Sequence, residues 1–143
     1  MNSNNLEKRK DKVLNFFKEK KFQEVIVEGE NLLKERQNDA QLLFLLGLAS
    51  INLQNFVNAE NYFEKLILFK RSAENLYTLG NIQKKLKKFN QAVNSFAEAI
   101  KLNPNFSEAY NNLGNTKKLI GQRDEAIIYY IFIVICSFCI IFY

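Results

Sequence analysis

Two cysteines near the end of the sequence have the spacing that most resembles a reactive site. Cys136 and Cys139 are separated by two residues, as in redox-active thiol pairs. A reactive thiol needs nearby cations or a helix N-terminus to lower its pKa. The neighbours here are the apolar side chains Ile135, Phe138 and Ile140. The sequence therefore predicts two inert apolar cysteines, which are too close together to form a disulfide framework for the domain.

Other catalytic chemistry lacks the residues that it needs. The sequence contains no histidine, which removes histidine acid–base catalysis, serine–histidine nucleophiles and most zinc sites. It contains no glycine-rich phosphate-binding motif, and its carboxylates are scattered among lysines. We therefore expect no catalytic residue, no metal and no cofactor, and a protein that is not an enzyme.

Composition and charge indicate a helical protein that binds another protein. The 143 residues are 48% hydrophobic, enough for a core, and include five glycines and one proline, so loops must be short. The net charge of +5 is concentrated in lysines between Lys84 and Lys118. A basic patch suits nucleic acid or an acidic peptide, and a solvated helix face is the simpler interpretation. No nucleic-acid motif accompanies it, so we expect no nucleic-acid partner.

The elements that position these residues repeat every 33 or 34 residues. Each repeat has a Leu-Gly pair, an alanine twelve residues after the glycine and an aromatic residue four residues later. These packing positions are Gly47, Gly80, Gly114, Ala59, Ala92, Ala126, Phe63, Phe96 and Tyr130. Such a period indicates stacked supersecondary units. Apolar residues at three- and four-residue steps on both sides of a short turn predict two antiparallel helices per repeat.

Three of the repeats resemble a known family, the tetratricopeptide repeats. The resemblance is strong from Ser107 to Gly114 and over residues 73–106, including Pro104, and residues 40–72 match with one residue fewer. It implies an all-α fold, a right-handed α-solenoid of antiparallel helix pairs. Residues 6–39 are degenerate, as expected of a terminal repeat.

These similarities predict a division of the chain into six segments. Val13 stands where the first repeat should have its glycine, and Gly29 where it should have its aromatic residue. The expected segments are a disordered N-terminus (1–5), a degenerate first repeat (6–39), a second repeat (40–72), a third repeat (73–106), an incomplete fourth repeat (107–130) and an apolar tail (131–143).

The recurring glycines predict close helix packing. A glycine inside a helix costs about 1 kcal/mol relative to alanine, so the glycines in register need a compensating gain. We expect that gain to be the close approach of the paired helix. In this interpretation Ala59, Ala92 and Ala126 lie opposite the glycines, and the aromatic residues fill the space toward the next repeat.

The resemblance implies a concave groove, lined by the first helix of each pair, that holds a protein or peptide. The expected contact residues are Tyr77, Thr78, Asn81, Lys84, Lys85, Asn111, Asn112, Asn115 and Lys118. Asparagine offers a donor and an acceptor, so an asparagine ladder can hold an extended peptide backbone. The alternative is that these asparagines are merely exposed.

Two departures from the family limit what this groove can bind. Some family members grip a terminal carboxylate with lysines and asparagines, but Leu14 and Leu45 stand where that clamp needs polar groups. The corresponding face of the second repeat (Phe44, Leu45, Leu48 and Ile51) is apolar. It either binds an apolar peptide segment or is covered by the first repeat, and we favour the second.

Residues 126–143 carry no charge, and the repeat pattern ends within them, at Tyr130. At ~1.5 Å per residue a helix of this length spans ~27 Å, just short of a ~30 Å hydrocarbon core. The segment is a membrane anchor, an unusually apolar last helix, or the product of a shortened or frame-disrupted gene. We favour the last, because the repeat continues to Tyr130 with no linker. An exposed tail of this kind would also allow self-association.

Together these features predict a protein- or peptide-binding scaffold or adaptor. No apolar signal core follows residues 1–12, so we expect a cytoplasmic location. One alternative is the recognition arm of a larger enzyme, since such arrays resemble the N-terminal parts of O-linked N-acetylglucosamine transferase-like proteins and repeat-bearing sulfotransferases. Another is a membrane-associated assembly factor anchored by the apolar tail.

Overall fold

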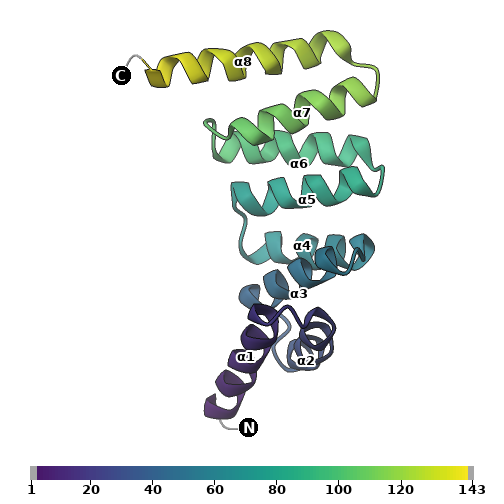
Figure 1. Ribbon diagram of the computed structural model, residues 1–143, viewed down its shortest axis with the longest axis vertical. Helices are drawn as coiled ribbons and strands as arrows, with labels where there is room; N and C mark the ends of the chain where they lie inside the picture. The colour runs from purple at the N-terminus through teal and green to yellow at the C-terminus, as the bar shows by residue number, and fades with distance from the viewer. Residues whose placement is uncertain (1–2, 142–143) are drawn as a thin grey trace. The chain divides into compact units, whose positions relative to one another are not determined.

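The protein is built from α-helices joined by short turns. The computed structural model describes the backbone from residue 3 to residue 141 and the side chains from residue 5 to residue 133. A first unit, Met1–Lys70, contains α1 (Ser3–Lys18), α2 (Phe22–Glu35), α3 (Ala40–Asn52) and α4 (Phe56–Phe69). A second unit, Arg71–Tyr143, contains α5 (Ala73–Lys85), α6 (Phe89–Leu102), α7 (Ser107–Leu119) and α8 (Arg123–Ile141) (Figure 1).

Within each unit the helices pack in chain order. In the first unit α1 packs on α2, α2 on α3 and α3 on α4, and α1 also touches α3. In the second unit α5 packs on α6, α6 on α7 and α7 on α8 (Figure 1). Helix α5 also touches α7. Within each unit the first hairpin therefore covers one face of the second, as in an α-solenoid. The expected all-α solenoid of antiparallel helix pairs is confirmed.

Both ends of the chain differ from the expected division. Helix α1 begins at Ser3, inside the segment 1–5 that was expected to be disordered, because no glycine or proline interrupts it there. Helix α8 runs unbroken through Tyr130, so no boundary separates the fourth repeat from the segment 131–143. The side chains after Ile133, including both cysteines, lie outside the described residues. In the described part of the chain, no helix combines the length and apolar character that a membrane crossing requires.

All four first helices end with the same backbone motif. Lys20, Gln54, Lys87 and Gly121 have positive φ angles of 58°, 57°, 60° and 84°. At each of these turns the next amide donates to the carbonyl five residues earlier, as from Lys88 to Gln83 at 2.8 Å. This is the bonding of a helix ended by a left-handed residue, a position that favours glycine. Only the last of the four turns has the glycine.

We expect Lys87→Gly to stabilise the second unit by about 1 kcal/mol. A residue with a Cβ atom is strained in the left-handed conformation, whereas glycine is not. Lys87 is exposed, so its side chain contributes little packing that the change would remove. Urea unfolding followed by circular dichroism measures the effect. Gly121→Lys, the reverse change at the equivalent turn, should lower the midpoint, and a fall for Lys87→Gly would contradict the strain argument.

The nearest neighbours of the repeat glycines are aromatic rings of the paired helix. A Cβ atom placed on Gly80 would lie 2.6 Å from Cε1 of Phe96, and one on Gly47 would lie 2.6 Å from Cε2 of Phe63. On Gly114 it would lie 3.0 Å from Cε1 of Tyr130. At Gly114 the backbone oxygen of Ala126 also lies 3.4 Å from this Cβ position, so an alanine does lie opposite that glycine, but the aromatic ring is the nearer neighbour at all three positions. The aromatic ring of the paired helix needs the space that a missing side chain leaves.

In the first hairpin the large and small positions are exchanged. Val13 of α1, at the position of the repeat glycines, is fully buried. Gly29 of α2, at the aromatic position, is also buried, and a Cβ atom there would lie 2.7 Å from Cδ2 of Leu46. The leucine of α3 thus occupies the space beside α2. The degenerate first repeat keeps a packed hairpin although its signature residues have changed.

Candidate peptide-binding groove

Helices α5 and α7 bring three of the predicted groove residues into one hydrogen-bonded cluster. The Nζ atom of Lys84 donates to Oδ1 of Asn112 at 2.7 Å. The Nδ2 atom of the same amide donates to the Tyr77 hydroxyl at 2.8 Å. Asn112 thereby links two residues of α5 from its position on α7. We call Tyr77, Lys84 and Asn112 the groove cluster.

The Tyr77 ring is held in place by two other aromatic rings. Its centroid lies 5.8 Å from that of Phe96, the residue under Gly80, and 4.8 Å from that of Phe106, just before α7. Both pairs are tilted, a favourable arrangement for aromatic rings. The Tyr77 hydroxyl is therefore presented from a rigid base, so little conformational entropy would be lost when a ligand binds.

Lys84 is a half-buried cation. Its Nζ atom lies 5.9 Å from the centroid of the Phe96 ring, within cation–π range. Burial, and then the neighbouring Lys85 charge, hold the pKa of Lys84 below its usual value. None of the ion pairs in the described part of the chain involves Lys84. A carboxylate from a partner would relieve this uncompensated charge.

The other predicted groove residues fall into two groups. Asn115 accepts a hydrogen bond from the Tyr130 hydroxyl at 2.9 Å and donates to Asn111 at 3.4 Å. The Thr78 hydroxyl donates to the carbonyl of Glu74 at 2.8 Å, so it is engaged by its own helix. Among the described residues, no side-chain hydrogen bond joins Asn81, Lys85 or Lys118 to a partner. These three are left available to a ligand.

Two contacts of this face were not expected from the sequence. Phe106 supports Tyr77, and the hydroxyl of Tyr130 fixes Asn115. Phe106 lies in the connection before α7, outside the helical periodicity that identified the other residues. The Tyr130 hydroxyl has a role only because the ring lies over Gly114, which brings it close to Asn115. The aromatic positions of the repeat therefore support the groove as well as the core.

The apolar face of the second repeat is covered only in part. Leu45 is buried, and Leu14 of α1 lines the same small pocket. Phe44 is exposed, with its ring 6.1 Å from that of Phe63. The favoured prediction, that the first repeat covers this face, holds at Leu45 but not at Phe44.

A series of helix hairpins, three of which have a glycine under an aromatic ring and two of which carry a polar face on the first helix, defines a class of helical repeat proteins. Two family models match this chain, one described as TPR repeat over residues 73–121 and one described as Tetratricopeptide repeat over residues 40–72. The chain belongs to the tetratricopeptide repeat family. The expectation from the repeat pattern is confirmed.

One curated relative and two solved structures illustrate these similarities. The "Probable UDP-N-acetylglucosamine--peptide N-acetylglucosaminyltransferase SEC" of Arabidopsis thaliana is 34% identical over 58 residues, which are 41% of this chain but only 6% of the plant protein. A MamA protein matches with a TM-score of 0.86 and 20% identity, over 94% of this chain and 74% of that one.

The second structure is YrrB, described as a TPR protein with an unusual peptide-binding site. It matches with a TM-score of 0.77 and 20% identity, over 85% of this chain and 63% of that one. At this level of identity the two structural matches show a shared fold.

Proposed function

We propose that this protein is a scaffold or adaptor that holds an extended, acidic segment of a partner protein against α5 and α7. Tetratricopeptide repeats typically act in protein binding as non-catalytic scaffolds. A peptide-binding site is also named in the description of YrrB, which shares the fold. The chain's role is therefore recognition.

The groove cluster is the observation that carries this proposal. Tyr77 and Asn112 are pre-oriented by aromatic packing and by hydrogen bonds, and Lys84 holds a half-buried positive charge. Around them, Asn81, Lys85 and Lys118 provide an amide and two further cations. An amide can pair with both the N–H and the C=O of an extended backbone, and the cations favour acidic side chains. The set fits an acidic segment in extended conformation.

Replacing Asn81, Asn112 and Asn115 together with alanine should weaken binding of such a segment by about tenfold or more. Each hydrogen bond lost is worth about 0.5–1.5 kcal/mol, and 1.4 kcal/mol corresponds to a factor of ten. The probes are peptides selected by phage display on the intact protein, with affinity measured by fluorescence anisotropy. Circular dichroism should show unchanged helicity.

Asn81→Ala alone separates recognition from internal support. Asn81 has no hydrogen bond to lose in the described part of the chain, so this variant should bind less tightly while its unfolding midpoint stays the same. Asn112→Ala removes two internal bonds and should lower both affinity and stability. Asn5→Ala, at an exposed position of α1, is the matched control. Equal affinity in the triple variant and the control would refute the groove assignment.

A second candidate is the recognition arm of a longer glycosyltransferase. The 34% identity over 58 residues to the Arabidopsis protein favours it. In that case the same groove would select protein substrates for a catalytic domain encoded elsewhere. Sequencing full-length transcripts of the gene tests this: a catalytic domain in the same reading frame supports the arm, and a stop codon after Tyr143 supports the scaffold.

A further inference from the structure

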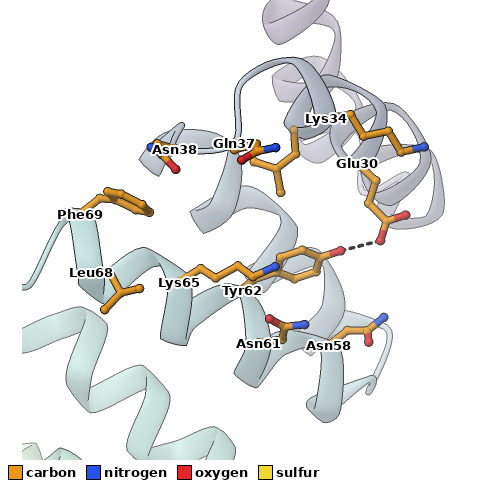
Figure 2. Close-up of a pocket in the computed structure, with 11 residues that line it drawn as sticks. Glu30, Lys34, Gln37, Asn38, Asn58, Asn61, Tyr62, Lys65, Leu68 and Phe69 are labelled. Carbon is orange, nitrogen blue, oxygen red and sulfur yellow. Dashed lines mark hydrogen bonds between the residues drawn. The ribbon is translucent and has the colours of Figure 1, made fainter.

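The first unit contains a pocket that shares no residue with the proposed groove. Its volume is about 640 Å³, within the range of ligand sites. Residues of α2, of the connection to α3 and of α4 line it, and no lining residue belongs to α1 or α3 (Figure 2). The pocket therefore belongs to the second helices of the hairpins, whereas the proposed groove uses the first helices. We call it the α2–α4 pocket.

Tyr62 sets the shape of the α2–α4 pocket. It corresponds in the repeat to Ser95 of α6, a small residue that donates to Gln83 at 2.7 Å. The larger Tyr62 side chain is buried, and its hydroxyl donates to Oε1 of Glu30 on α2 at 2.6 Å (Figure 2). Burial, and then the Glu30 carboxylate, raise the pKa of Tyr62, so it stays a donor. The bond joins the two walls and occupies the Glu30 carboxylate.

One end of the pocket is apolar and exposed. Leu68 is 78% exposed and Phe69 is 50% exposed, and the two lie together at the end away from Glu30 (Figure 2). Leu68 corresponds in the repeat to Lys101 of α6, where the polar residue expected on a solvent-facing position is present. Leu68 buries little of its apolar surface within the protein, so packing does not explain a leucine at this position. The pair offers a contact for an apolar side chain of a ligand.

The rest of the lining is basic and rich in amides. Lys34 projects from α2 and Lys65 from α4, and Glu30 is the one carboxylate in the lining. Within the described part of the chain, Lys65 has no charged or hydrogen-bonded partner, and Lys34 donates only to Asn31 at 3.4 Å. Both walls carry side-chain amides, which are Gln37, Asn38, Asn58 and Asn61. Amides on both sides can pair with the two edges of an extended backbone.

We propose that the α2–α4 pocket binds a short, extended, acidic peptide segment that carries one apolar anchor residue. The anchor packs on Leu68 and Phe69, an acidic side chain lies between Lys34 and Lys65, and the four amides bond the backbone. The charge balance selects an acidic rather than a basic segment. The lining has two lysines and one carboxylate, and Tyr62 already engages that carboxylate. This site is independent of the groove on α5 and α7.

The test uses the intact protein and the probe fluorescein-Gly-Ser-Glu-Phe-Glu-Gly-Ser-amide. Saturable binding, measured by fluorescence anisotropy, should weaken about tenfold when Lys34 and Lys65 are both changed to glutamate. The matched control, Lys8→Glu with Lys18→Glu, makes the same charge change in the same unit outside the pocket. It should leave the affinity within about twofold. Leu68→Ser, which removes the exposed apolar contact without changing the charge, should also weaken binding.

Nuclear magnetic resonance then locates the site. With unlabelled probe, the side-chain amide signals of Asn58, Asn61 and Gln37 should shift, and these shifts should be lost when Lys34 and Lys65 are changed to glutamate. Signals of Asn81 and Asn115 report the proposed groove separately and should respond to the probe in the same way in that variant as in the wild type. Any of three outcomes overturns the proposal: no saturable binding, shifts confined to α5 and α7, or equal affinity for a probe with lysines in place of the glutamates. Unchanged amide spectra elsewhere in the variants verify that they are folded.

Discussion

Phe96→Ala should destabilise the second unit by about 3–5 kcal/mol, the largest single effect that we expect in this protein. The Phe96 ring is fully buried and packs with Ala92 and Leu113 in the core of the second unit. It also lies under Lys84 and beside Tyr77. Truncation removes the transfer energy of the ring and leaves a cavity between helices. Urea unfolding followed by circular dichroism measures the loss.

The matched control for Phe96 is Phe69, a phenylalanine that ends α4 with half of its surface exposed. Phe69→Ala should cost far less, because solvent already reaches the ring and no closed cavity forms. Peptide binding gives a second readout. In Phe96→Ala the Tyr77 ring loses one of the two rings that hold it in place, so affinity should fall at temperatures where the variant is still folded. If both truncations shifted the unfolding midpoint equally, the claim that the buried Phe96 ring contributes more to stability than an exposed ring would be disproved.

Gly80→Leu should cost roughly 1–3 kcal/mol through overpacking. The Cβ atom alone would lie 2.6 Å from Cε1 and 2.8 Å from Cδ1 of Phe96, closer than carbon atoms approach in proteins. The ring cannot move aside cheaply, because it is fully buried. The helix-propensity gain over glycine, about 1 kcal/mol or less, offsets only part of this cost. The measurement is again the urea midpoint.

Gly114→Leu is a graded comparison for Gly80→Leu. The ring beside Gly114 belongs to Tyr130, which is half-buried and can turn outward. The loss should therefore be smaller, and should be accompanied by loss of the Tyr130–Asn115 hydrogen bond. A Gly80→Leu protein as stable as the wild type would rule out close packing of glycine against the ring.

Much of the fold could be predicted because helix pairs are encoded locally. The period of 33 or 34 residues, the apolar steps and Pro104 gave the hairpins and their order. The groove residues on α5 and α7 followed from the resemblance to the family combined with helical spacing. The partner of each glycine could not be predicted in this way. Alanine and the aromatic residue are separated by one helical turn, so both lie on the side facing the first helix.

Signals along one helix say nothing about which side chains of different helices meet. The sequence therefore determined the all-α repeat, the family and the polar face that carries Asn81, Lys84 and Asn112. Only the tertiary structure decided that Asn112 joins Tyr77 to Lys84, and that Tyr62 reaches Glu30 to form the α2–α4 pocket. Those contacts depend on the distance and rotation between helices, which packing of the buried side chains sets and no local pattern records.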